Sequence, residues 1–157
     1  MQTYNDFSVS SGVSGNALAE VNAKFPVRPH PLIPLFPPLI TSQIDQTNFA
    51  GVAASDLAII SSAAQLSEQA ETATGGFNTA VAAASGTAAT ALQNGKIKNK
   101  VLKLQTDVMR IQIEVAQGNT ASQSELAAQQ AKLATNVALD KAAAGQAATA
   151  VSFAGSD

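Results

Sequence analysis

Large apolar residues recur at alternating spacings of four and three between Lys96 and Gln117. The residues in this pattern are Ile97, Val101, Leu104, Val108, Ile111 and Val115. Such spacing lines one side of an α-helix, and Leu102, Met109 and Ile113 widen the stripe on its flanks. The pattern therefore predicts a central helix with packing neighbours on several sides.

Two helices are predicted before this central helix. The first begins at Thr41 or Ser42, either of which can cap it, and ends at the glycine pair Gly75-Gly76. Its inner face is formed by apolar residues at helical spacing: Ile44, Val52, Ile59, Ala63, Leu66 and Ala70. The second helix, from Phe77 to about Leu92, is nearly all Ala, Thr and Ser. Asn94-Gly95 then predicts a turn into the central helix.

One helix is predicted after the central helix, which Gly118-Asn119 should end. Ser122 and Glu125 have the spacing of a capping box at the start of this last helix. We expect Gly145 to kink the last helix or to end it early. Its inner stripe is expected to contain Leu126, Leu133, Val137, Ala144 and Val151.

The first 25 residues are polar and mixed. The loose alternation of Tyr4, Phe7 and Val9 predicts a short extended piece. From Ser14, a short helix is predicted that ends before Pro26, because the residue before a proline disfavours helical geometry. The apolar residues that predict this helix are Leu18, Val21 and Phe25.

All six prolines lie between Pro26 and Pro38, in a stretch that we call the proline-rich arm. Proline fixes φ and removes an N–H donor, so the arm is expected to be extended or polyproline-like. Its remaining residues are unusually apolar. The arm either lies over its own bundle or docks on another copy or a partner. The candidate residues for self-association are Val27, Leu32, Ile33, Leu35, Phe36 and Leu39.

Together these patterns predict an all-α fold. The expected architecture is an antiparallel bundle of about four main helices, with a short N-terminal helix and an extended proline-rich arm. The predicted organisation is an N-terminal segment over residues 1–40, a helical bundle over 41–154 and a tail over 155–157.

Composition narrows the classes of function. Charged residues make up 13% of the 157 residues, so the surface offers little electrostatic repulsion between copies. Cysteine is absent, which excludes disulfides, thiolate metal sites and cysteine nucleophiles. A net charge of -2 gives no case for nucleic acid. No apolar run long enough for a transmembrane helix and no signal peptide are visible.

Four lysines gather between Lys96 and Lys103. Lys96, Lys100 and Lys103 share one face of the central helix, whereas Lys98 is expected to point elsewhere. The shared face is a candidate for binding an anionic partner. The default expectation is pairing with acidic residues of neighbouring helices, such as Glu68 or Asp140.

Residues typical of enzyme active sites are not arranged in a recognisable pattern. His30, the single histidine, lies between two prolines, and we expect it to be an exposed residue of the arm. The chain contains no paired-carboxylate, P-loop, Rossmann or nucleophile-elbow motif. We therefore expect a protein that is not an enzyme and that holds no metal or cofactor.

Three stretches carry a resemblance to a known group of proteins. They are FSVSSGVSGNALAEVNAKF (7–25), LQNGKIKNKVLKLQTDV (92–108) and DKAAAGQAA (140–148). Together they resemble basidiomycete fungal small secreted proteins, in which a similar N-terminal segment precedes a helical region with a similar core motif. The resemblance implies an extracellular or cell-wall-associated α-helical protein with no catalytic residues to carry over. This chain departs from that group in its proline-rich arm and in lacking a visible secretory signal.

Three functions follow as hypotheses. The first is a structural protein that self-associates into oligomers or filaments through the arm and small-residue helix faces. The second is a bundle that binds an apolar ligand, such as a fatty acid, or a hydrophobic surface. The third is a lysine face that binds an acidic partner, such as an anionic cell-wall polysaccharide.

The central stripe can be tested by mutation. Leu104→Asp should unfold the domain, because it places an unpaired charge at the centre of the stripe. Lys103→Gln should be nearly silent for stability. Thermal unfolding followed by circular dichroism measures both, and equally small losses would mean that the stripe is not the core.

Overall fold

The computed structural model describes residues 3–25 and 48–155. These residues are mostly helical, which confirms the all-α prediction in its coarse form. The candidate self-association residues of the proline-rich arm lie outside the described residues: Val27, Leu32, Ile33, Leu35, Phe36 and Leu39.

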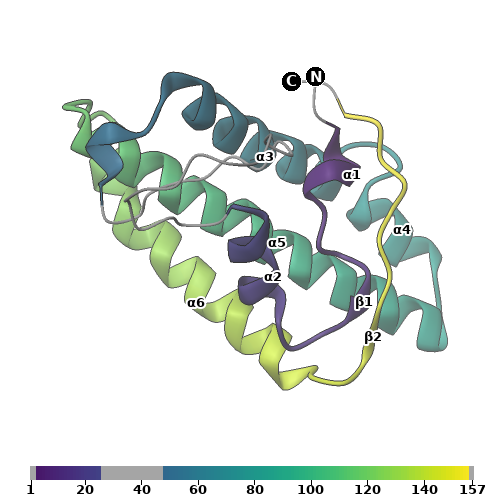
Figure 1. Cartoon of the computed structure of the whole chain (residues 1–157). Helices are drawn as coiled ribbons and strands as arrows, with labels where there is room; N and C mark the ends of the chain where they lie inside the picture. The colour runs from purple at the N-terminus through teal and green to yellow at the C-terminus, as the bar shows by residue number, and fades with distance from the viewer. Residues whose placement is uncertain (1–2, 26–47, 156–157) are drawn as a thin grey trace, which may run out of the picture.

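Three long helices form the body of the molecule. They are α3 (Ala54–Thr72), α5 (Gly86–Ala116) and α6 (Leu126–Ala142). Helix α5 packs against both of the others, lies between them and runs antiparallel to each (Figure 1). Because α5 has neighbours on both sides, its apolar stripe can be wide without being exposed to solvent.

Short elements complete the described fold. Before α3 come α1 (Tyr4–Phe7), strand β1 (Gly12–Val13), α2 (Ala17–Lys24) and a 3₁₀ turn, η1 (Phe49–Gly51). After it come α4 (Phe77–Ala83), a second 3₁₀ turn, η2 (Gln123–Glu125), and strand β2 (Ala147–Ala148). The N-terminal segment that contains α1, β1 and α2 crosses the face of α5 (Figure 1).

The start of the central helix differs from its prediction. The turn at Asn94-Gly95 is wrong, because α5 begins at Gly86 and runs without interruption for 31 residues. The helix expected from Phe77 to Leu92 is wrong for the same reason, since α4 ends at Ala83. The break falls at Gly86, whose φ of +61° is a left-handed conformation that glycine adopts without strain.

Helices α3 and α6 also begin later than predicted. Val52, expected inside the helix, is extended, and α3 begins at Ala54; the predicted caps Thr41 and Ser42 lie outside the described residues. The predicted capping box of Ser122 is wrong, because η2 precedes α6 and no side chain caps α6. Before α6, backbone groups bond to one another instead: the N–H of Glu125 donates to the carbonyl of Ser122 at 3.0 Å.

The two ends of the chain are only partly as predicted. The short helix before Pro26 is confirmed as α2, but Tyr4 to Phe7 form a helical turn and not an extended piece. Gly145, with a φ of +82°, turns the chain after α6. The expected inner residues Ala144 and Val151 therefore lie beyond the last helix.

The core lies on the faces that α3 and α5 present to each other and to the N-terminal segment. The predicted stripe of α5 is confirmed in its middle, since Val101, Leu104, Val108 and Ile111 are buried, whereas its end residues Ile97 and Val115 are half-buried. Its flanking residues Leu102, Met109 and Ile113 are buried as well. The N-terminal segment contributes further core residues, which are Tyr4, Phe7, Ala17, Val21 and Phe25.

Gly95 offers a test of why α5 continues through Asn94-Gly95. A Cβ atom at Gly95 would collide with the backbone carbonyl of Thr149 and lie 3.0 Å from that of Ser10. In an ordinary helix, Gly→Ala stabilises by up to about 1 kcal/mol. We expect Gly95→Ala instead to destabilise by about 1–3 kcal/mol, the usual cost of overpacking.

Urea unfolding of Gly95→Ala measures this effect. Thr87→Ala, at an exposed position of the same helix, is the matched control and should be neutral or slightly stabilising. A stabilised Gly95→Ala protein would contradict the close approach of Thr149 to the helix.

Candidate functional site

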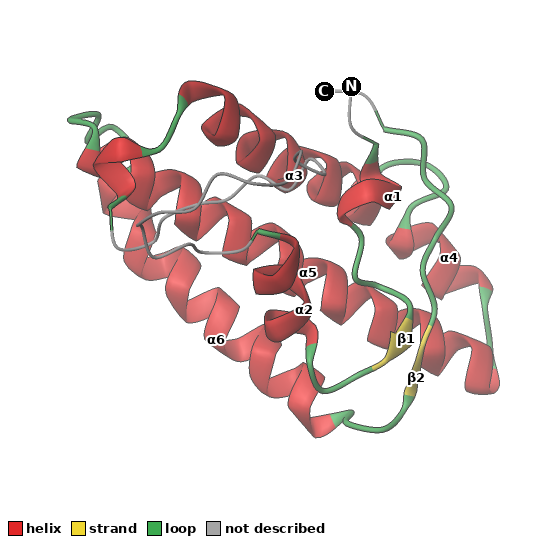
Figure 2. Cartoon of the chain, in the orientation of Figure 1, coloured by secondary structure: helices red, strands yellow, loops and turns green. Residues whose placement is uncertain are grey.

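The two short strands form a ribbon against α5. Strand β1 pairs antiparallel with β2, and Gly12 lies opposite Ala148 (Figure 2). An isolated two-stranded ribbon is marginal in water, and the outer edge of each strand carries unpaired backbone groups. Here α5 supplies partners for those groups from its side chains.

Lys98 occupies the outer edge of β1. Its ammonium donates to the carbonyl oxygens of Ser11 and Val13 and to a carboxylate oxygen of Glu20, each at 3.0 Å. The Lys98 side chain is 0% exposed, whereas that of Glu20 is 38% exposed. Three acceptors match the three donors of an ammonium, so the buried charge is fully satisfied. Lys98 therefore takes the place of a third strand and joins β1 and α2 to α5.

Asn94 and Gly95 hold β2 and the residue after it against α5. The side-chain amide of Asn94 donates to the carbonyl of Ala147 at 2.9 Å. Next to it, the missing side chain of Gly95 leaves room for the carbonyl of Thr149. The backbone N–H of Thr149 donates to the carbonyl of Ala91 at 2.9 Å, so the returning chain follows α5 closely.

Asn99 connects three elements through a buried network. Its amide nitrogen donates to the carbonyl of Ser67 in α3 at 2.8 Å. Its amide oxygen accepts from the hydroxyl of Tyr4 in α1 at 2.9 Å. Burial raises the pKa of the Tyr4 hydroxyl above its ordinary value, because the charged form is desolvated. Tyr4 is therefore kept as a neutral donor within the core.

Asp140 caps α2 from the end of α6. Its two carboxylate oxygens accept from the backbone N–H groups of Gly15, at 3.0 Å, and Ala17, at 2.8 Å. The first N–H groups of a helix lack partners within it, and a negative charge there is favourable. The expectation that Asp140 pairs with the lysines of α5 is wrong, because both of its oxygens face α2.

These contacts bring together the three stretches on which the resemblance rests, residues 7–25, 92–108 and 140–148. We call the polar residues that make these contacts the polar seam: Tyr4, Asn94, Lys98, Asn99 and Asp140. The expectation that Lys98 points elsewhere than the other lysines is correct, but its burial was not predicted. A signal was present, since Asn94 and Lys98 are four residues apart and so share a helix face.

The lysine face of α5 is paired within the chain. Lys100 and Lys96 lie 3.1 Å and 4.0 Å from one carboxylate oxygen of Glu71, and Lys103 lies 3.7 Å from the other. Lys103 also pairs with Glu68, as the default expectation had it. Binding of an anionic partner by these lysines stays a prediction, and it would compete with Glu68 and Glu71.

A groove of about 530 Å³ runs between α3, α5 and α6. Arg110 is one of the lining residues, and its guanidinium donates to Asp107, at 2.7 Å, and to Glu114, at 2.9 Å. The guanidinium is therefore occupied from both sides. Other charged residues in the lining are Glu68, Lys103 and Lys132. Charges of both signs make this groove suited to a hydrophilic molecule or to water and unsuited to a lipid tail.

Two other kinds of site can be described for residues 3–25 and 48–155. No helix there is long and apolar enough to cross a lipid bilayer. In the same ranges, no three His, Asp or Glu side chains gather in a way that could hold a metal ion. His30 lies outside the described residues.

The contribution of Lys98 can be measured by substitution. Lys98→Met keeps the apolar stem but leaves the carbonyls of Ser11 and Val13 without their donor. We expect the free energy of unfolding to fall by about 2–4 kcal/mol in urea titrations, less than for a fully buried pair because Glu20 stays partly solvated.

Lys96→Met is the matched control for Lys98→Met. It makes the same change two residues away, where the ion pair is long and partly solvated, and it should cost less than about 1 kcal/mol. Equal losses in the two variants would show that the seam contributes no more than a surface pair.

Comparisons with known proteins identify a family but no activity. Neither the curated proteins nor the solved structures yielded a match to the chain. A family model described as "Domain of unknown function (DUF8454)" matches residues 1–152. That match spans the polar seam, the groove and every described helix. The chain therefore belongs to the DUF8454 family.

Proposed function

We propose that this chain is a non-enzymatic structural or interaction protein that is exported from the cell and associates with further copies of itself. Export is supported by the resemblance to small secreted proteins. The lack of catalysis is supported by the polar seam, since its buried lysine, aspartate, tyrosine and asparagines are all bound within the fold. The proposal takes the helices as an antiparallel bundle that carries an extended proline-rich arm.

The outer face of α6 carries the proposal. Its inner side, which contains Leu133 and Val137, is half-buried, while an opposite stripe is exposed. Spacings of four and three place the stripe on one side of the helix. The stripe consists of small apolar residues: Ala127, Ala131, Ala134, Ala138 and Ala142. Beside it, Leu139 is 47% exposed and adds a larger apolar side chain to the outer surface of the helix.

The distribution of charge supports the same proposal. Only 13% of the chain is charged, and the groove and lysine face of α5 hold much of that charge. The five alanines of the outer stripe are uncharged and Lys141 is the exposed charge beside its C-terminal end, so copies can approach there while desolvating few ions. The apolar residues of the arm, which lies outside the described residues, would add a second contact surface, as their sequence indicates.

The alternative of an apolar ligand has less support. The groove beside α5 is lined by charges. A second hollow, between α2 and α6, has a volume of about 260 Å³. Typical ligand pockets have volumes of about 300–1,000 Å³, so this hollow is small for a fatty acid. Self-association is therefore the better-supported function.

Self-association through α6 predicts a concentration-dependent mass. Light scattering coupled to size exclusion should show oligomers of the full chain. The double variant Ala131→Glu/Ala138→Glu should raise the dissociation constant at least about tenfold, because it places two charges in the contact. Deletion of residues 26–40 should weaken association as well.

Ala58→Glu is the matched control, since Ala58 is an exposed alanine of α3 and glutamate is also a good helix former. It should leave the mass unchanged. A full-length chain that stays monomeric at high concentration would overturn the proposal, and so would an oligomer that is indifferent to the α6 variant and to the deletion.

A further inference from the structure

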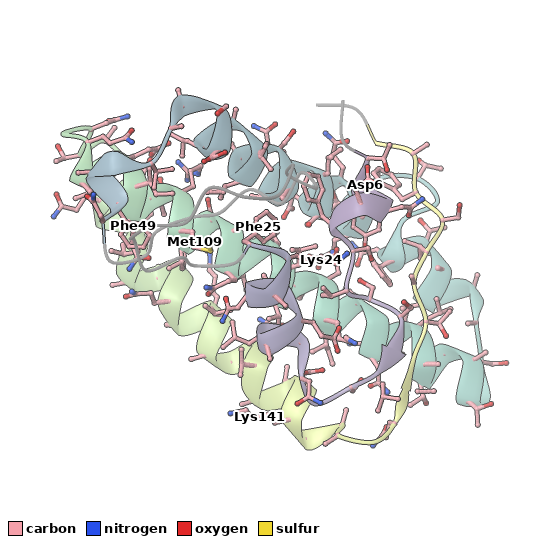
Figure 3. All side chains as sticks on the ribbon, in the orientation of Figure 1. Asp6, Lys24, Phe25, Phe49, Met109 and Lys141 are labelled. Atoms are coloured by element: carbon pink, nitrogen blue, oxygen red, sulfur yellow. The ribbon has the colours of Figure 1, made fainter. Side chains whose placement is uncertain are left out.

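Residues 3–25 form a docking unit with its own internal contacts. The rings of Phe7 and Phe25 stack with centroids 6.0 Å apart. The ammonium of Lys24 donates to the backbone carbonyl of Asp6 at 3.0 Å (Figure 3). The carboxylate of Asp6 accepts from the backbone N–H of Thr3, and this bond lowers the pKa of Asp6. These contacts close α1 against α2, and we call residues 3–25 the N-terminal unit.

Within the part of the chain that the structure describes, the bonds from this unit to other segments reach elements after residue 48. Tyr4 bonds to Asn99, Lys98 holds Glu20, and Asp140 holds the start of α2. In addition, the side-chain amide of Gln105 donates to the amide oxygen of Asn22 at 3.1 Å. The receiving face on α5 and α6 is thus complementary to the N-terminal unit in apolar shape and in polar groups.

The receiving face requires an occupant. Without the N-terminal unit, Lys98 would lose all three of its acceptors, and Asp140 would lose both of its donors. A second copy of the chain carries the same unit with the same groups. The same contacts would form whether the unit belongs to the same chain or to another copy.

The number of residues between the N-terminal unit and η1 allows the unit to bind either its own chain or another copy. The 22 residues from 26 to 47 join the N-terminal unit to η1. At about 3.3 Å per residue, 22 residues can reach across roughly 70 Å. A domain of this length has a radius of gyration of only about 15 Å. Chain length therefore does not force the unit onto its own body.

We propose that the N-terminal unit is exchanged between copies, so that residues 3–25 of one chain occupy the receiving face of another. The proposal rests on the self-association proposed above and adds to the outer stripe of α6 a second way in which copies hold one another. Reciprocal exchange between two copies gives a closed pair, in which every seam contact is kept and none is new. Such a pair forms at high protein concentration, where a neighbouring unit can compete with the tethered one.

Cysteine cross-linking tests the exchange directly, because the natural chain has no cysteine. One chain carries Asn22→Cys and a second carries Gln105→Cys, at the contact between the unit and α5. The two chains are unfolded together, refolded at high concentration and treated with a short bis-maleimide. Exchange predicts a covalent dimer that contains one chain of each kind, on denaturing gels and by mass spectrometry.

Two matched controls define the result. The double variant Glu68→Cys/Lys103→Cys reports a contact between α3 and α5 that both choices keep within one chain, so its product should have the mass of a monomer. Asn22→Cys alone and Gln105→Cys alone should not give the mixed dimer.

The double variant Asn22→Cys/Gln105→Cys separates this inference from the self-association on which it rests. Cross-links between chains in the oligomer fraction support exchange. An oligomer whose cross-link stays within each chain overturns exchange and leaves self-association intact. A chain that is monomeric at every concentration overturns both.

Discussion

A buried ammonium group is the constraint on which the rest of this fold depends. Lys98 cannot remain charged in the interior unless acceptors surround it, and it finds them in the carbonyls of Ser11 and Val13 and in Glu20. Those acceptors fix the path of β1 and the position of α2. The ribbon then has one edge closed by Lys98 and the other by Asn94. In this way Lys98 holds the N-terminal part of the chain on the central helix, and Asn94 holds the C-terminal strand beside it.

Helix α5 therefore has a different role on each of its sides. Its apolar stripe joins the long helices, its polar seam orders the chain ends, and its remaining charges pair with α3 or line the groove. The most recognisable motif of the sequence, residues 92–108, is explained by these structural roles. Polar side chains of the kinds that also occur in catalytic sites are bonded here to other parts of the fold. This use of the polar residues supports the proposal that the protein acts by association through its outer surfaces.

The sequence was sufficient to predict the apolar stripe of the central helix, but it was not sufficient to predict the buried polar contacts. Periodicity located the stripe around Leu104 because burial repeats with the helix. It did not find the start of α5, because the local preference of Asn94-Gly95 for a turn is overridden by tertiary partners near Thr149. The pairing of Lys103 with Glu68 could be predicted from neighbouring helices. The burial of Lys98 could not, because its backbone acceptors lie 85 and 87 residues away.

The cap that Asp140 provides also sets the order in which the chain can fold. Its partners Gly15 and Ala17 precede it by 125 and 123 residues, and Tyr4 precedes Asn99 by 95. Contacts between residues so far apart in sequence raise the contact order and slow folding. Synthesis proceeds from the N-terminus, so α2 leaves the ribosome long before the carboxylate that caps it. The segment that is made first is therefore the one that completes its structure last.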